Sequence, residues 1–102
     1  MSFFHHVYFY PIESANPTDQ AELIGMCQTL LATIPGLTTF ALGTPAGTDR
    51  PVVDNDYIVA LLLEFPDAAA EKEYQVHPQH IQFVSESQRL WSTVKVFDSN
   101  GL

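Results

Sequence analysis

The stretch DYIVALLLEF, residues 56–65, decides the fold, because it is the most apolar segment of the chain. Its length and its flanking residues favour a β-strand over a helix. Its alternating side chains are apolar on both faces: Ile58, Ala60 and Leu62 on one, and Val59, Leu61, Leu63 and Phe65 on the other. This pattern is typical of a central strand that is covered on both sides.

Three other segments predict strands, because they contain β-branched and aromatic residues: 3–11, 37–43 and 93–97. Residues 44–55, rich in Pro, Gly and Asp, predict a long loop. We expect Arg50 in this loop to be solvated, with an anion contact as the less favoured alternative. Residues 3–11 are also apolar on both faces, since two sets of side chains alternate: His6, Tyr8 and Tyr10 against Phe3, His5, Val7 and Phe9.

Two helical segments separate these strands. Asn16 and Pro17 are typical of a helix start, and this first helix is expected to stop at Pro35-Gly36. Its apolar stripe contains Cys27, which we interpret as a core residue rather than a reactive thiol. The second helix starts at Pro66-Asp67. It should break at Pro78, because the residue before a proline avoids helical geometry, and a further helical piece reaches about residue 90.

The resulting order, β-α-β-β-α-β, predicts a ferredoxin-like α+β sandwich that forms a single domain over residues 1–102. A three-layer α/β sheet is the alternative, but two helical segments are too few to cover it. In the sandwich, helices cover only one face of the sheet. The other face would expose a large apolar patch, so we expect two sheets to pack face to face in a homodimer.

Composition narrows the classes of partner. The 102 residues include 46% hydrophobic but only 16% charged residues, which indicates that another chain covers part of the surface. A net charge of −8 and four scattered Lys and Arg residues argue against nucleic acid and against anionic membranes. No apolar run could span a bilayer, and the N-terminus does not resemble a signal peptide. The single cysteine fits a reducing compartment, so a cytoplasmic location is expected.

The histidines form the most informative chemical pattern. His77 and His80 flank Pro78 in the stretch Tyr74–His80, and His5 and His6 head the first strand. Few other groups transfer protons near neutral pH, so the two places together would make an acid–base pocket. His80 and His6 are the candidate catalytic residues. We interpret His77 mainly as a structural residue at the kink, and the candidate ligand-binding residues are Tyr74, Tyr8, Tyr10 and His77.

Simpler interpretations compete with catalysis. Histidines at helix junctions often do no more than donate a hydrogen bond to a nearby carbonyl. From chemistry alone, this structural role is favoured over a catalytic role. A metal site ranks low, because His-x-x-His lacks the i, i+4 spacing of the helical zinc motif and no acidic ligand is placed by sequence. Neither a phosphate-binding loop nor a nucleophile elbow is recognisable. We therefore expect no metal and no cofactor.

The chain resembles the stress-responsive α/β-barrel family, also called the Dabb domain, over nearly its whole length. The His-Pro-x-His element is the most specific match. The resemblance implies a ferredoxin-like protomer in a dimeric α+β barrel. The matching segments are 6–9, 34–37, 56–65, 74–84 and 94–98.

Some plant relatives in this family are polyketide cyclases that need no cofactor. The resemblance maps their strand histidine and the second histidine of their His-Pro-x-His onto His6 and His80, with Tyr74 as a neighbouring pocket residue. The cyclases also place a tyrosine in the first helix. By its spacing to residues 34–35, Cys27 stands at that position here.

Three functions follow. In the first, each protomer of a small cytoplasmic homodimer encloses an apolar pocket for a small aromatic or polyketide-like ligand. His80 would act as general base there, while His6 and Tyr74 orient a carbonyl or phenol for cyclisation or isomerisation. The second is a non-catalytic stress-response or ligand-binding dimer, and the third a cofactorless monooxygenase. The first requires His6 and His80 to lie close together beside a cavity.

Overall fold

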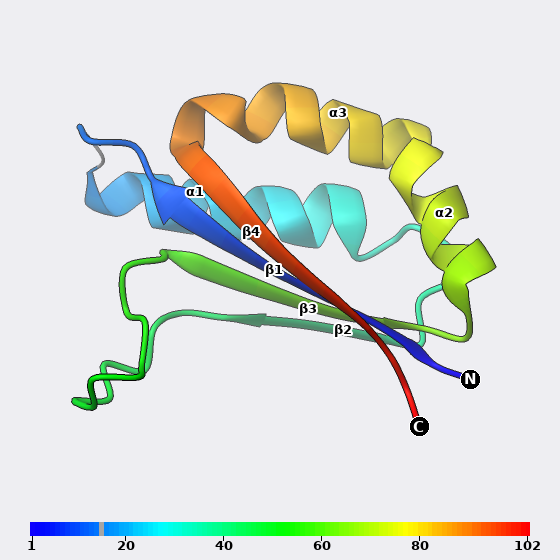
Figure 1. The fold of residues 1–102 in the computed structure, drawn as a ribbon. Helices are drawn as coiled ribbons and strands as arrows, with labels where there is room; N and C mark the ends of the chain where they lie inside the picture. Colours follow the sequence, from blue (N-terminus) through cyan, green and yellow to red (C-terminus); the bar gives the residue numbers. More distant parts are fainter. Residues whose placement is uncertain (15) are drawn as a thin grey trace.

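The computed structural model describes residues 1–14 and 16–102. One four-stranded sheet carries all its helices on a single face (Figure 1). The predicted order of elements is confirmed. It runs β1 (Phe3–Pro11), α1 (Pro17–Met26), η1 (Cys27–Leu31), β2 (Thr39–Gly43), β3 (Val59–Phe65), α2 (Ala68–Val76), α3 (Pro78–Ser87), η2 (Gln88–Leu90) and β4 (Trp91–Asn100).

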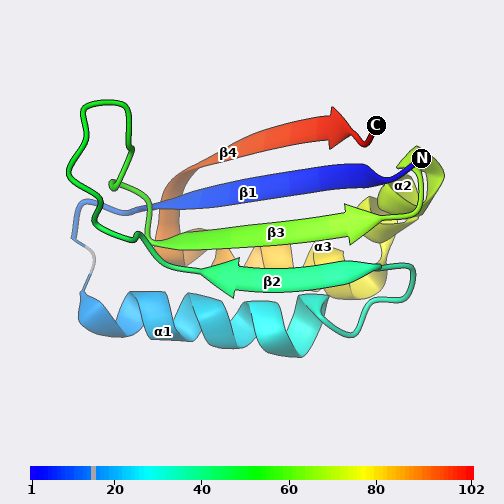
Figure 2. The same cartoon turned by 90° about the horizontal axis from the view of Figure 1, so that it is seen from below.

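The strands lie in the order β2-β3-β1-β4, and every neighbouring pair is antiparallel (Figure 2). This is the ferredoxin-like arrangement that the sequence predicts. The strands β1 and β3 are central, as their apolar composition requires, and β4 and β2 form the edges. The loop between β2 and β3 extends past the ends of the strands, and the two termini lie together at the opposite end (Figure 2).

Side-chain alternation divides the sheet into a covered face and an open face. On the covered face, Val7, Phe9, Leu61 and Leu63 are buried beneath the helices. The open face carries their sequence neighbours, including Leu62, which is 37% exposed, and Phe97, which is 59% exposed. The sheet is therefore apolar on both sides, although this chain covers only one of them.

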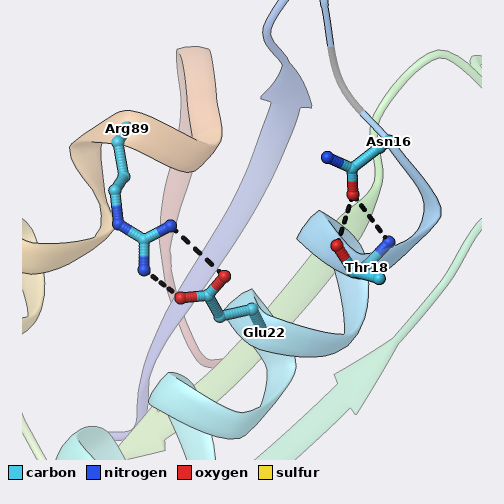
Figure 3. A network of polar contacts seen from close by, with 4 residues as sticks. All are labelled: Asn16, Thr18, Glu22 and Arg89. Atoms are coloured by element: carbon cyan, nitrogen blue, oxygen red, sulfur yellow. Dashed lines mark hydrogen bonds and ion pairs between the residues drawn. The ribbon is translucent and has the colours of Figure 1, made fainter.

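Local signals fix where α1 begins. The Asn16 side chain accepts a hydrogen bond from the Thr18 amide (3.0 Å; Figure 3). The Asp19 carboxylate accepts one from the Asn16 amide (3.1 Å). These bonds satisfy amides that a helix start leaves free. An ion pair between Glu22 and Arg89 then joins α1 to η2 on the surface (Figure 3).

The first helix ends earlier than the sequence predicts. Regular α-helix stops at Met26, and η1 continues as a π-helical segment in which the Ala32 amide donates to the Cys27 carbonyl (3.1 Å). The Thr29 hydroxyl donates to the Gly25 carbonyl (3.0 Å) and so competes for the acceptor that an α-helical turn would use. Cys27 is buried in the core, as predicted.

The break before α3 lies where the sequence predicts it. His77, the residue before Pro78, has an extended backbone, and Pro78 occupies the first turn of α3. The inward face of α3 and η2 consists of Phe83, Ser87 and Leu90. Ile81 does not belong to this inward face, since it is 58% exposed.

No helix in the described part of the chain is both long enough and apolar enough to cross a membrane.

Replacing Leu61 by Ala should lower the free energy of unfolding by about 3 kcal/mol, because a buried leucine loses its contacts and leaves a cavity. The same change at the fully exposed Leu102 should alter it by less than about 0.5 kcal/mol. Urea denaturation of the two variants measures both values. Equal effects would contradict the assignment of the covered face.

Candidate functional site

His5 lies on the covered face of β1, where it is only 5% exposed. Its Nδ1 lies 2.5 Å from Oδ1 of Asp98, its register partner on β4. A carboxylate can only accept a hydrogen bond, so the Nδ1–H of His5 donates it. In a neutral imidazole the free lone pair is then on Nε2. Asp98 thus fixes both the orientation of the ring and the nitrogen that is available to a ligand.

Tyr74 and His80 complete a group of three polar side chains. Tyr74 comes from the last turns of α2 and is almost completely buried, whereas His80 comes from the first turn of α3 and is half-buried. The Tyr74 ring contacts both imidazoles edge-on, with centroids 6.1 Å from His5 and 4.8 Å from His80. The kink at Pro78 is what turns α3 so that His80 reaches Tyr74.

These three side chains line one cavity of about 200 Å³ between the sheet and the helices. Its walls include β4, which is an edge strand of the sheet. Apart from Gln75, the remaining lining residues are apolar. They are Val7, Phe9, Leu31, Leu61, Phe83, Val84, Trp91, Val94 and Val96. The cavity can therefore hold a small apolar molecule with its polar atoms directed at the histidines and the tyrosine.

Burial sets the protonation of this group. It lowers the pKa of His80, and the nearby His5 lowers it further, although a hydrogen bond to the Gln75 backbone and the charge of Glu71 oppose this. Burial also raises the pKa of Tyr74 well above its usual value, with contributions from Cys27 and Glu71. At neutral pH His80 is thus a free base, and Tyr74 keeps its proton.

The predicted pairing of His6 with His80 is wrong. His6 lies on the open face of the sheet, opposite Phe97 on β4 and Leu62 on β3, whereas His80 lies on the helix side. The structure brings His5 to His80 instead. The missed residues are His5 and Asp98, and the signal for His5 was its position in phase with Val7 and Phe9, the more apolar set on that strand.

Tyr8 and Tyr10 also lie on the open face and do not line the cavity of His80. They line a separate hollow of about 400 Å³ together with His6 and residues of β4 and the β2–β3 loop. The Tyr10 hydroxyl donates to Oδ2 of Asp54 (2.6 Å), which raises the pKa of Tyr10 to about 12. Lys95 lies over the Tyr10 ring, 4.9 Å from its centroid, and its Nζ is 4.0 Å from Oδ2 of Asp54, so it helps to hold the loop against the sheet.

His77 does not belong to the cavity wall either. Its Nδ1 accepts a hydrogen bond from the Gln79 amide (3.1 Å), which makes it the N-cap of α3. The prediction of a structural role at the kink is confirmed, and its inclusion among the ligand-binding residues of the pocket is wrong. Cys27 is inert near neutral pH, because burial raises its pKa to about 12.

Within the residues that the structure describes, no three His, Cys, Asp or Glu side chains converge as a metal site would require.

The sequence model of the family described as Stress responsive A/B Barrel Domain (Dabb) matches residues 4–100. The chain belongs to the Dabb family. Among curated protein sequences, none matches this Dabb chain significantly.

Several solved structures share the Dabb fold. A Dabb family protein with a ferredoxin-like fold from Mesorhizobium loti is 24% identical with a TM-score of 0.80, covering 99% of this chain and 97% of its own. A dimeric ferredoxin-like protein of unknown function from Thermobifida fusca is 20% identical, with a TM-score of 0.80 and coverages of 97% and 90%. The hydroxynitrile lyase of Passiflora edulis is 15% identical, with a TM-score of 0.80 and coverages of 96% and 91%. At these identities the likeness establishes the fold.

If His77 acts in this Dabb domain as a helix cap, His77→Ala should lower the free energy of unfolding by about 1 kcal/mol. His77→Asn should restore most of that loss, because an asparagine side chain also accepts from an amide at a helix start. Thermal and urea denaturation of both variants measure the difference. A cap role would be refuted by equal stability of the alanine and asparagine variants.

Proposed function

We propose that this Dabb domain performs cofactor-independent acid–base chemistry, of the cyclase or isomerase type, on a small apolar ligand that carries a carbonyl or hydroxyl group. The observation that carries the proposal is the convergence of His5, Tyr74 and His80 on one apolar cavity. Such a cavity, with few polar groups and shifted pKa values, is the usual form of an active site.

The three side chains have complementary roles in this proposal. His80, unprotonated at neutral pH, removes a proton from the ligand. Tyr74, which keeps its proton, donates a hydrogen bond to the oxygen on which negative charge develops. His5 is a positioning residue: its Nδ1–H is held by Asp98, so Nε2 accepts from a ligand hydroxyl.

The proton balance is simple for a ligand with an acidic C–H beside a carbonyl. The C–H bond breaks, its proton goes to His80, and its electron pair moves into the carbonyl to form an enolate that Tyr74 stabilises. Return of the proton to another atom completes an isomerisation. In a cyclisation the enolate carbon attacks a second carbonyl, and the proton held by His80 passes to the alkoxide that forms. Neither outcome needs an oxidant, a reductant or a metal.

Fold likeness adds limited support. The hydroxynitrile lyase of Passiflora edulis has the same fold, and cleavage of a hydroxynitrile also needs a base to remove a hydroxyl proton. An enzyme whose reaction starts with proton removal is therefore compatible with this architecture. The specific ligand of the present chain follows from its own cavity rather than from that neighbour.

A direct test is exchange of the methyl protons of acetophenone in D2O, followed by NMR. The wild-type protein should accelerate exchange, and His80→Asn should abolish the acceleration, since the base is lost. His77→Asn is the matched control, because it makes the same change on the same helix outside the cavity. Because burial lowers the pKa of His80, the rate at about pH 6.5, where an ordinary histidine is half protonated, should exceed half of its maximum, and it should fall as the pH drops further.

Two results separate this proposal from a non-catalytic role. Thermal stabilisation by acetophenone without any exchange would favour a ligand-binding protein. Proton exchange that persists in the His80→Asn variant would show that His80 is not the base.

We also propose that two copies of the chain form a homodimer through their open sheet faces. Tyr8, Tyr10, Leu62 and Phe97 make this face apolar and aromatic, the composition that interface centres favour. The 31 strand residues rise about 3.3 Å each in strands about 4.8 Å apart, so this face presents about 500 Å² per subunit. Two such faces would bury about 1,000 Å² in total, the least that a specific interface requires. Related structures from Thermobifida fusca and Jannaschia are described as dimeric, which supports the proposal.

Phe97→Glu should convert such a dimer to a monomer, because it places a charge on the apolar face that the two copies would share. Ile81→Glu is the matched control, since Ile81 has nearly the same exposure (58% against 59%) but lies on the helix side. Sedimentation velocity at micromolar concentration distinguishes the two states. A monomeric wild-type protein would eliminate the proposed dimer.

A further inference from the structure

A second hollow lies outside α3 and meets the cavity at His80. It has a volume of about 410 Å³ and is lined by Gln75, His80, Ile81, Val84, Ser85 and Gln88. Gln75, His80 and Val84 also line the inner cavity, so these three side chains form the boundary between the two spaces. We call the outer hollow the α3 groove.

The two spaces differ in chemistry. The inner cavity is apolar except at His5, Tyr74, Gln75 and His80. The α3 groove instead sets Ile81 and Val84 beside the uncharged hydrogen-bonding groups of Gln75, Ser85 and Gln88. Nε2 of Gln75 donates to Oε2 of Glu71 (2.7 Å), so this amide is held in place at the boundary. A single ligand that filled both spaces would therefore need an apolar part and a neutral polar part.

The size of the inner cavity limits the apolar part. An apolar cavity of about 150 Å³ holds benzene, so about 200 Å³ holds one ring with a small substituent. A longer ligand has to extend out of the cavity, and the α3 groove is the neighbouring space, because Gln75, His80 and Val84 line both. The charge of the protein restricts the polar part: the net charge is −8 and Glu71 lies beside the groove, so an anionic group would be repelled.

We infer that the natural ligand has two parts: a single-ring apolar head bearing oxygen, held in the cavity, and an uncharged hydroxyl-rich tail such as a sugar, held in the α3 groove. The inference rests on the proposed function, because it takes the inner cavity as the site of the reacting head. It adds a class of ligand and three residues that select it, Ser85, Gln88 and Gln75.

Three probes with one common head test the inference by binding alone. 4-Methoxyphenol carries only the head, 4-hydroxyphenyl β-D-glucopyranoside replaces its methyl by a neutral sugar, and 4-hydroxyphenoxyacetate replaces it by an anionic tail. Calorimetric titration should show the glucoside binding at least about fivefold more tightly than the methyl ether, since each neutral hydrogen bond contributes about two- to tenfold. The carboxylate should bind more weakly than the methyl ether.

The double variant Ser85→Ala/Gln88→Met should remove the advantage of the glucoside and leave the affinity for 4-methoxyphenol unchanged. Both residues are exposed, Ser85 on α3 and Gln88 at the start of η2, so the fold tolerates the change. Gln82→Met is the matched control, because it makes the same change at an exposed position on α3 outside the groove. The control should bind all three probes as the wild type does.

The outcomes distinguish this inference from the proposed function. Equal affinities for the glucoside and the methyl ether, or an advantage that survives in the double variant, overturn the two-part ligand while acid–base catalysis by His80 still stands. Failure of all three probes to bind at millimolar concentration overturns the inference and also counts against the cavity as a ligand site. Loss of proton exchange in His80→Asn with normal probe binding supports both.

Discussion

Strict alternation of side chains along β1 is the constraint on which the site depends. This strand is hydrogen-bonded to β3 on one side and to β4 on the other, so its register cannot shift without breaking two ladders. His5 is therefore committed to the covered face and His6 to the open one. Two adjacent and chemically identical residues acquire different surroundings, one beside Tyr74 and the other opposite Phe97.

Burial favours the uncharged form of both His80 and Tyr74, the proton acceptor and the hydrogen-bond donor of the cavity. His80 keeps its lone pair and Tyr74 keeps its proton, so an acceptor and a donor coexist at the same pH. Asp98, the carboxylate bonded to His5, has a side chain that is 43% exposed and stays partly hydrated. The site thus orients an imidazole without burying a full charge, which would cost much more.

The parts of this structure that depend on local signals could be predicted from the sequence. Asn16, Pro17 and Pro78 set helix boundaries through nearby backbone groups, and β-strand composition set the order of elements. The histidine partner was predicted wrongly, because both faces of β1 are apolar and the phase of His5 with Val7 and Phe9 is only a weak signal between them. Asp98 was missed for another reason. It joins the site only through its register with His5, a contact between residues 93 positions apart.

The position of the termini has a mechanical consequence. The first and last strands lie side by side with the two chain ends together, and the Gly101 amide donates to the Ser2 carbonyl (2.6 Å). Tension applied to the two ends would peel β4 from β1 one rung at a time, the geometry of a zipper rather than of a shear joint. The rung of His5 and Asp98 is among the first to open. Tension or fraying at the ends would break the hydrogen bond between His5 and Asp98, and so release the imidazole, before the hydrophobic core unfolds.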